Sequence, residues 1–248
     1  MEFRNVSFSY PDAVEPVLED ISFTAKQGDT VAFIGSTGSG KSTLINLVPR
    51  FFDATGGEVL IDGINVKDYK LESLLNKIGY VPQQAVLFKG TVESNVAYGD
   101  NGCAEYSPDD VKKAIEIAQG AEFVEKMEGR QEAAVSQGGA NLSGGQKQRL
   151  SIARAVCRKP EIYIFDDSFS ALDYKTDRLL RSALKKETAG VTNLIVAQRI
   201  GTIMDADQII VLDEGKIVGR GKHRELLKTC DVYREIAMSQ LTEEELAS

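Results

Sequence analysis

The sequence predicts an α/β fold with a mainly parallel sheet, an N-terminal antiparallel β subdomain and a helical insertion subdomain. Three observations predict it. Residues 1–25 alternate between apolar and polar positions, the middle of the chain is mainly helical, and after residue 160 short apolar runs alternate with a helical pattern. Strands that alternate with helices are typical of a parallel sheet with crossover connections.

The N-terminal third begins with β-forming residues on both sides of the turn residues Pro11 and Asp12, which predicts an antiparallel hairpin. An apolar run at residues 30–34 predicts a strand. It stops at the glycine-rich residues 35–40, after which residues 42–48 have helical character. This part of the chain therefore predicts a strand, a loop and a helix in that order.

The middle and last thirds define the domain organisation. The predicted helices in the middle are residues 108–119, 121–127 and 143–157, the later strands are 162–165, 192–197, 208–213 and 216–219, and a helix at 174–188 lies between the first two of these strands. We expect one domain over residues 1–248. Its core and β subdomain would comprise residues 1–85 and 159–248, and its helical subdomain residues 86–158.

Composition limits the classes of partner. The 37 acidic and 29 basic residues give a net charge of −8, which makes nucleic acid or an anionic membrane surface an unlikely main partner. The longest apolar runs are far shorter than the ~20 residues of a membrane-spanning helix, and the N-terminus lacks the pattern of a signal peptide. Cys103, Cys157 and Cys230 have no metal-ligand spacing. We expect a cytoplasmic chain with reduced thiols.

A phosphate-binding motif occupies residues 35–42, which read GSTGSGKS between the predicted strand and helix. Its glycines allow backbone N–H groups to point inward, and the following helix adds the positive end of its dipole. Lys41 would add a point charge for the β- and γ-phosphates of a nucleotide, and the Ser42 hydroxyl would bind Mg²⁺. A flexible turn rich in glycine and serine would not need the Lys-Ser pair at the start of a helix.

Two acidic residues end the predicted strand at 162–165. An acid at the carboxyl edge of a parallel strand lies where ligands bind, so Asp166 is the candidate for holding Mg²⁺. Asp167 is the candidate for orienting or deprotonating the attacking water. Alone, an Asp-Asp-Ser sequence is more often a helix cap. The upstream phosphate motif favours the metal, because phosphoryl transfer needs an acid that positions it.

Residues 142–149 read LSGGQKQR, which resembles the signature of the ATP-binding cassette (ABC) family. The resemblance extends over nearly the whole chain and implies a P-loop NTPase (RecA-like) core, ATP and Mg²⁺. In this family the signature contacts a nucleotide held by a second subunit, which implies a head-to-tail dimer with two ATP molecules between the chains. The residues expected to bind the nucleotide are Tyr10, Gly35, Ser36, Thr37, Gly38, Ser39, Gly40, Lys41, Ser42, Thr43, Ser143, Gly144, Gly145 and Gln146.

Further motifs follow in the order of the family. Tyr10 is similar to the aromatic residue that stacks on adenine, although a lone strand tyrosine is more often core or surface. Gln83 is similar to the Q-loop glutamine that reaches Mg²⁺, with Gln84 as the alternative. Residues 170–173 resemble the D-loop at the dimer interface, and residues 87–95 resemble a segment of exporters. The resemblance implies a membrane domain as a partner and a location at the cytoplasmic face of the membrane.

Three positions depart from the family pattern. Asp167 stands where the family has a catalytic glutamate, and Gln198 stands where it has the switch histidine. Residues 133–139 lack two acidic residues that exporters carry there. The only histidine, His223, lies beyond the switch position and is expected to begin a surface helix. Because the shorter carboxylate is withdrawn from the water, we expect slow hydrolysis.

Asp167 and Gln198 would serve the nucleotide held by this chain, whereas the intact signature would serve that of the partner. This asymmetry predicts one half of a heterodimeric exporter with a degenerate site of its own, joined to a different chain. Two alternatives remain. One is a soluble, non-transport ABC ATPase acting on ribosomes or DNA, and the other is a binding module that switches on ATP without meaningful turnover.

Overall fold

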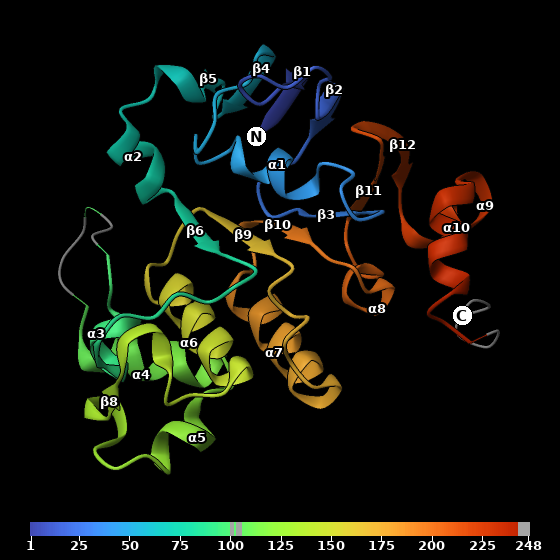
Figure 1. Ribbon diagram of the computed structural model, residues 1–248. Coiled ribbons are helices and arrows are strands. Elements are labelled where there is room, and N and C mark those ends of the chain that lie inside the picture. Colours follow the sequence, from blue (N-terminus) through green and yellow to red (C-terminus); the bar gives the residue numbers. More distant parts are fainter. Residues whose placement is uncertain (100–101, 103–105, 243–248) are drawn as a thin grey trace. The chain divides into compact units, whose positions relative to one another are not determined.

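The computed structural model describes residues 1–99, 102 and 106–242 (Figure 1). Within it the chain forms two compact units. Unit 1 contains residues 1–74 and 192–248, and unit 2 contains residues 75–191. Helix α2 (Leu71–Asn76) contains the first boundary between them. Cys103 lies outside the described residues, and Cys157 and Cys230 are free, buried thiols, as expected.

An antiparallel sheet occupies the N-terminal part of unit 1. Its strands lie in the order β2 (Leu18–Thr24), β1 (Glu2–Phe8), β4 (Gly56–Ile61) and β5 (Ile64–Asn65). The β1–β2 pair is antiparallel, which confirms the predicted hairpin. Phe3 and Phe23 are register partners and stack with ring centroids 4.5 Å apart. Such cross-strand aromatic pairs stabilise the buried face of a sheet.

Unit 1 also contains parallel strands. Strand β3 (Thr30–Gly35) pairs in parallel with β10 (Thr192–Val196) on one side and with β11 (Gln208–Asp213) on the other, and β12 (Lys216–Gly221) is antiparallel to β11. The four residues at positions 31–34 are all buried. A strand that is covered on both faces reads as a continuous apolar run, which is why residues 30–34 were identifiable as a strand.

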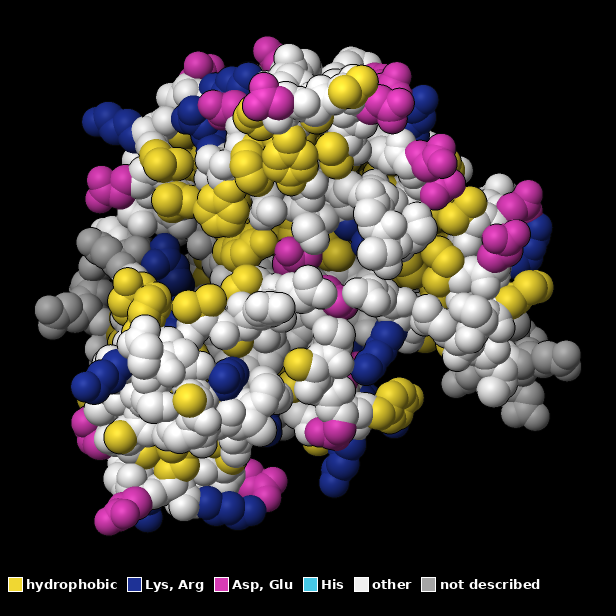
Figure 2. All heavy atoms as spheres, viewed as in Figure 1, with side chains coloured by type: hydrophobic (Ala, Val, Ile, Leu, Met, Phe, Trp, Pro, Cys, Tyr) yellow, Lys and Arg dark blue, Asp and Glu magenta, His cyan; other side chains and the backbone are white. Residues whose placement is uncertain are grey.

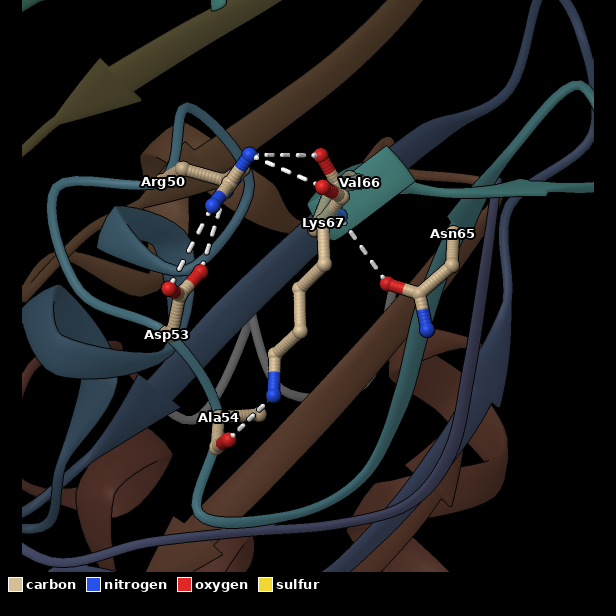
Figure 3. A network of polar contacts seen from close by, with 6 residues as sticks. All are labelled: Arg50, Asp53, Ala54, Asn65, Val66 and Lys67. Carbon is tan, nitrogen blue, oxygen red and sulfur yellow. Dashed lines mark hydrogen bonds and ion pairs between the residues drawn. The ribbon is translucent and has the colours of Figure 1, made fainter. Parts of the chain in front are cut away.

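A polar network follows helix α1 (Lys41–Asn46) and fixes the connection to β4 (Figure 3). Arg50 donates to both carboxylate oxygens of Asp53 and to the carbonyl oxygens of Val66 and Lys67 in the short helix η1 (Val66–Asp68). The Lys67 ammonium in turn donates to the Ala54 carbonyl at 2.8 Å. Arginine suits this place because its planar group holds several acceptors at once.

Unit 2 combines two parallel strands with helices. Strand β6 (Ile78–Val81) pairs with β9 (Ile162–Asp166). Helix α6 (Gly144–Cys157) packs against α3 (Val92–Val96), α4 (Pro108–Ile117) and β6. The other elements are α5 (Ala121–Glu125), η2 (Arg130–Glu132), η3 (Gln137–Gly139), α7 (Tyr174–Glu187) and the strand pair β7 (Gly90–Thr91) and β8 (Ala134–Val135).

The compact units differ from the expected division at residues 86–158. Unit 2 also contains β6, β9 and α7, because β6 pairs with β9 and packs on the signature helix α6, and because α7 contacts α4. Strands β6 and β9 and helix α7, which we expected in the core, therefore belong to the same compact unit as the helices of residues 86–158. The division of function between a core and a helical subdomain stays a prediction.

His223 begins helix α9 (His223–Thr229), which is exposed at four of its seven residues, as expected of a surface helix, but the His223 side chain is not one of them. The side chain is buried, and its Nδ1 lies 2.7 Å from the hydroxyl of Tyr233 in helix α10 (Asp231–Met238). Burial lowers the pKa of His223, and the nearby Arg224 lowers it further, whereas Asp205 acts in the opposite direction. The apolar packing of α9 and α10 removes the imidazole from water.

The buried imidazole predicts a pH dependence of stability. Its pKa is lower in the folded than in the unfolded state. The contribution of the neutral imidazole to the stability of the fold is therefore fully present above the unfolded pKa of about 6.5. It is lost as the pH falls through that value towards the folded one. Each pKa unit between the folded and unfolded states lowers the free energy of unfolding by about 1.4 kcal/mol at low pH. Urea unfolding at pH 7.5 and 5.5 should show a larger acid loss in the wild type than in His223→Gln, and equal losses would contradict the prediction.

Candidate functional site

The glycine-rich loop at residues 35–42 joins β3 to α1, as predicted. All three of its glycines have positive φ angles, 152° at Gly35, 84° at Gly38 and 96° at Gly40. A Cβ atom at Gly35 would lie 1.9 Å from the Leu212 carbonyl oxygen, and one at Gly40 would lie 2.7 Å from Leu18 Cδ2. Only glycine allows the backbone to turn this tightly against β11 and β2. The loop is thus held by its neighbours in unit 1.

Lys41 turns its ammonium group back onto the loop. Its Nζ donates to the carbonyl oxygens of Gly35 at 2.9 Å and Ser36 at 2.6 Å, and to the Ser39 hydroxyl at 3.1 Å. A positive charge is therefore held at the loop by backbone acceptors. The arrangement offers a point charge to an anion that approaches the same loop.

Tyr10 follows β1 and contacts the helix that begins at the loop. Its hydroxyl lies 3.0 Å from Thr43 Oγ1 on α1, and its ring makes edge contacts with Phe8 and Phe52. The residue is 36% exposed. In Figure 2 apolar side chains gather over the part of unit 1 that contains α1. Tyr10 is thus a partly exposed aromatic residue bonded to the helix that follows the glycine-rich loop, and its stacking on adenine stays a prediction.

Gln198 lies at the same sheet edge as the loop. Strands β10 and β3 are parallel, with Val196 opposite Phe33, so Gln198 and the glycine-rich loop both follow the carboxyl ends of adjacent strands. Ligands of parallel sheets bind at this edge. Unit 1 therefore brings together four of the predicted features: the loop, Lys41, Tyr10 and Gln198.

The two acidic residues of unit 2 are buried at the end of β9. Asp166 is the last residue of the strand, and Asp167 follows it with a φ angle of 44°. The Tyr80 hydroxyl donates to Asp166 Oδ2 at 3.3 Å, and Gln83 Nε2 donates to Asp167 Oδ2 at 3.2 Å. Burial, reinforced by the Asp166 charge, raises the pKa of Tyr80, so the phenol remains a donor.

The bond to Asp167 favours Gln83 over Gln84 as the glutamine beside the acids. Ser168 also ties the end of β9 to β6, because its buried hydroxyl donates to the Val81 carbonyl oxygen at 2.8 Å. The segment that carries Gln83 is thereby bonded to the segment that carries both acids. Unit 2 brings three of the predicted site residues together: Asp166, Asp167 and Gln83.

The signature residues cap helix α6. Ser143 is the N-cap residue, its hydroxyl accepts from the Gln146 N–H, and Gln146 Oε1 accepts from the Ser143 N–H at 2.8 Å. This reciprocal pair is a capping box. Gly144 and Gly145 begin the helix, and a Cβ atom at Gly144 would meet nothing within 4 Å. The first helical turn is therefore open at Gly144, whereas a Cβ atom at Gly145 would lie 3.5 Å from the Ala171 carbonyl oxygen.

Two residues of α6 that the sequence analysis did not select connect the signature helix to its surroundings. The buried Gln148 donates to the Pro82 carbonyl oxygen at 3.0 Å, next to Gln83. Arg154 donates to the carbonyl oxygens of Val86 and Asn95. A signal for Gln148 exists in the sequence, since it shares a helix face with the buried apolar residues four, seven and eight positions later, Ile152, Ala155 and Val156.

The remaining motifs have defined places in unit 2. Asp173, in the segment that resembles the D-loop, is the N-cap of α7, and its carboxylate accepts from the Thr176 N–H. Asn95 holds the segment at residues 87–95 through bonds to the Phe88 backbone. The segment at residues 133–139 contributes β8, which pairs with β7. The functions expected of these three segments stay predictions.

Comparison with known families and proteins gives concordant results. A family model described as ABC transporter matches residues 18–170. An uncharacterized ABC transporter ATP-binding protein of Mycobacterium tuberculosis (strain ATCC 25618 / H37Rv) is 50% identical over 240 residues, which are 97% of this chain and 41% of that protein. An ATP-dependent lipid A-core flippase of Hahella chejuensis is 43% identical over 243 residues, or 98% of this chain and 41% of the flippase.

A solved structure is also similar. The chain matches a bacterial Atm1-family ABC exporter with ATP bound, with a TM-score of 0.92 and 36% sequence identity, over 98% of this chain and 42% of that one. The chain therefore spans about two fifths of the length of these relatives. Among the residues that the structure describes, no helix is long and apolar enough to cross a membrane.

Proposed function

The chain belongs to the ABC transporter family, and from this premise we propose that it binds and hydrolyses ATP with Mg²⁺ and thereby drives an exporter. The observation that carries the proposal is the glycine-rich loop with Lys41 held against its carbonyl oxygens. A preformed loop with a fixed positive charge suits the phosphates of a nucleotide. The similarity to a flippase and to an exporter with ATP bound supports transport out of the cytoplasm.

The residues present fit ATP and Mg²⁺. The loop cannot accept a Cβ atom at Gly35 or Gly40, so its backbone stays available to phosphate oxygens. Ser42 and Asp166 supply the hydroxyl and carboxylate oxygens that Mg²⁺ prefers, and Gln83 lies beside the acids. Bound Mg²⁺ would neutralise charge on the phosphates. Tyr10 would stack on the base, and Thr43 would lie beside the phosphates.

Two residues make the chain's own site slow in this proposal. Asp167 would orient the attacking water from one methylene further away than a glutamate, and Gln198 would offer an amide where the family has an imidazole. An amide can donate to a γ-phosphate but cannot carry a proton's charge. The site would then hold nucleotide and turn it over weakly.

The signature residues would complete the site of a second chain. Ser143, Gly144 and Gly145 stand at the start of α6, where backbone N–H groups can reach a phosphate. The proposed assembly is a head-to-tail dimer with a second nucleotide-binding domain, in which a different chain supplies the faster site. A membrane domain at the cytoplasmic face of the membrane would be the other partner, and the part of the relatives outside the matched region leaves room for it.

The proposal is tested by the dependence of hydrolysis on chain concentration. If a complete site needs two chains, phosphate release per chain should double when the concentration doubles, as long as most chains are monomers. ATP binding to the monomer should not change over the same range. Slow hydrolysis is expected at every concentration. A rate per chain that is constant from dilute to concentrated samples would contradict completion of the site by a second copy of this chain, and absence of ATP binding would contradict the proposed function itself.

A further inference from the structure

Helix α8 (Ile200–Ile203) begins two residues after the switch position Gln198, and no side chain at its N-cap position accepts a hydrogen bond from its first turn. The first N–H groups of a helix have no partner within the helix. The residue at the N-cap position is Arg199, whose side chain has donors only and cannot accept a hydrogen bond. Ile200 itself is fully buried. The N–H of Ile200 therefore needs an acceptor from another part of the chain.

Gln240 supplies that acceptor from beyond the end of α10. Its Oε1 accepts from the Ile200 N–H at 2.8 Å, and its Nε2 donates to the Gln198 carbonyl oxygen, also at 2.8 Å. A primary amide presents a donor and an acceptor side by side, so it pairs with the backbone as a neighbouring strand would. The two bonds hold the backbone groups on either side of Arg199, which are the Gln198 carbonyl and the Ile200 N–H.

Apolar packing holds Gln240 at this place. Ala197, Ile200 and Ile203 belong to the same buried cluster as Tyr233 and Ala237 of α10, and Leu241 packs against that cluster. The backbone N–H groups of residues 240 and 241 both donate to the Ala237 carbonyl oxygen. The turn that carries Gln240 is thus packed against the switch segment. Both segments belong to unit 1.

We propose that Gln240 is a positioning residue for the switch loop: it fixes the backbone at Gln198 and thereby aims the Gln198 side chain at the γ-phosphate. The inference rests on the proposed function, in which Gln198 contacts that phosphate. Gln240 does not touch nucleotide in this proposal and acts only through the loop. It connects the C-terminal helices α9 and α10 to the discrimination between ATP and ADP, which differ by the γ-phosphate.

Nucleotide titrations of the chain test the effect on the site. Gln240→Ala removes both bonds, and Gln240→Glu keeps an acceptor for Ile200 but loses the donor to Gln198. We expect Gln240→Ala to weaken ATP binding by about 10-fold, the worth of one hydrogen bond to a charged group, while ADP binding changes less than about 2-fold. Ser239→Ala, which removes a bond to the Ile236 carbonyl oxygen at the same helix end, should change neither.

Hydrogen exchange tests the bond directly. The Ile200 amide should be protected in the wild type, should remain protected in Gln240→Glu, and should exchange about 10- to 100-fold faster in Gln240→Ala. The amides of Met204 in the same segment and Leu241 at the helix end, which donate to backbone carbonyl oxygens, should keep their rates and show that the fold is intact.

The outcomes separate this inference from the proposed function. If the Ile200 amide exchanges equally fast in the wild type and in Gln240→Ala, or if ATP and ADP binding weaken equally, Gln240 has no positioning role. If the wild type fails to bind ATP while the Ile200 amide shows the expected protection, the proposed nucleotide site is wrong and the bond to the switch loop still stands.

Discussion

Replacing Lys41 with alanine is expected to weaken ATP binding by about 10- to 100-fold, because a hydrogen bond from a charged donor is worth about 1.5–3 kcal/mol. In the structure the ammonium is held by two carbonyl oxygens and one hydroxyl of the loop. It is therefore placed at the loop before any anion arrives, and its removal also leaves those acceptors without their donor. Calorimetric titration with ATP and Mg²⁺ measures the change.

Lys67→Ala is the matched control for this experiment. Lys67 belongs to the same unit and also donates to a backbone carbonyl oxygen, that of Ala54, but it lies in the network after α1 and not in the loop (Figure 3). ATP affinity should stay within about 2-fold of the wild type in the control. An equal loss in both variants would mean that Lys41 acts through the fold and not through the phosphates.

Lengthening Asp167 to glutamate is expected to raise the rate of ATP hydrolysis by about 100-fold, the lower range of what a positioned general base contributes. The buried carboxylate of Asp167 accepts from Gln83, so the groups around it are already in place and only the reach is short. Asp167→Asn should abolish the residual rate. ATP affinity should hardly change in either variant, since the water and not the nucleotide is the target.

Phosphate release under saturating ATP gives the comparison. Asp53→Glu adds the same methylene to an acid that pairs with Arg50 outside the site, and it should leave the rate unchanged. Adding Gln198→His to Asp167→Glu should raise the rate further if both positions limit turnover. The proposal of a degenerate site fails if the wild type hydrolyses ATP as fast as these variants do.

Local sequence signals predicted much of the fold. Residues 30–34 form a continuous apolar run because β3 is buried on both faces, and residues 35–40 carry glycines because β11 and β2 approach the loop closely. The signature helix begins after its N-cap residue Ser143 because the capping box is encoded within four consecutive residues. Only the capping box depends on neighbours in the chain, but each feature leaves a local pattern of apolar, glycine or capping residues, which is what a single sequence records.

Contacts between distant residues could not be predicted in this way. Gln240 lies 40 residues after Ile200, and nothing in either segment alone indicates the pair. His223 looks like a polar residue at the start of an exposed helix, yet Tyr233 on the next helix covers it. Pairing of β6 with β9 likewise joins segments that are 84 residues apart. Single-sequence patterns contain no record of such tertiary contacts.

The left-handed backbone conformation of Asp167 opposes two properties, the stability of the fold and the rate of hydrolysis. Aspartate adopts a positive φ angle more readily than glutamate does, and the chain has a φ of 44° at this residue. The shorter acid therefore relaxes the turn at the same position where a longer one would assist the chemistry. Natural proteins often exchange activity for stability in this way. In the proposed degenerate site, which holds nucleotide and hydrolyses it slowly, the shorter acid would favour stability of the fold over the rate of hydrolysis.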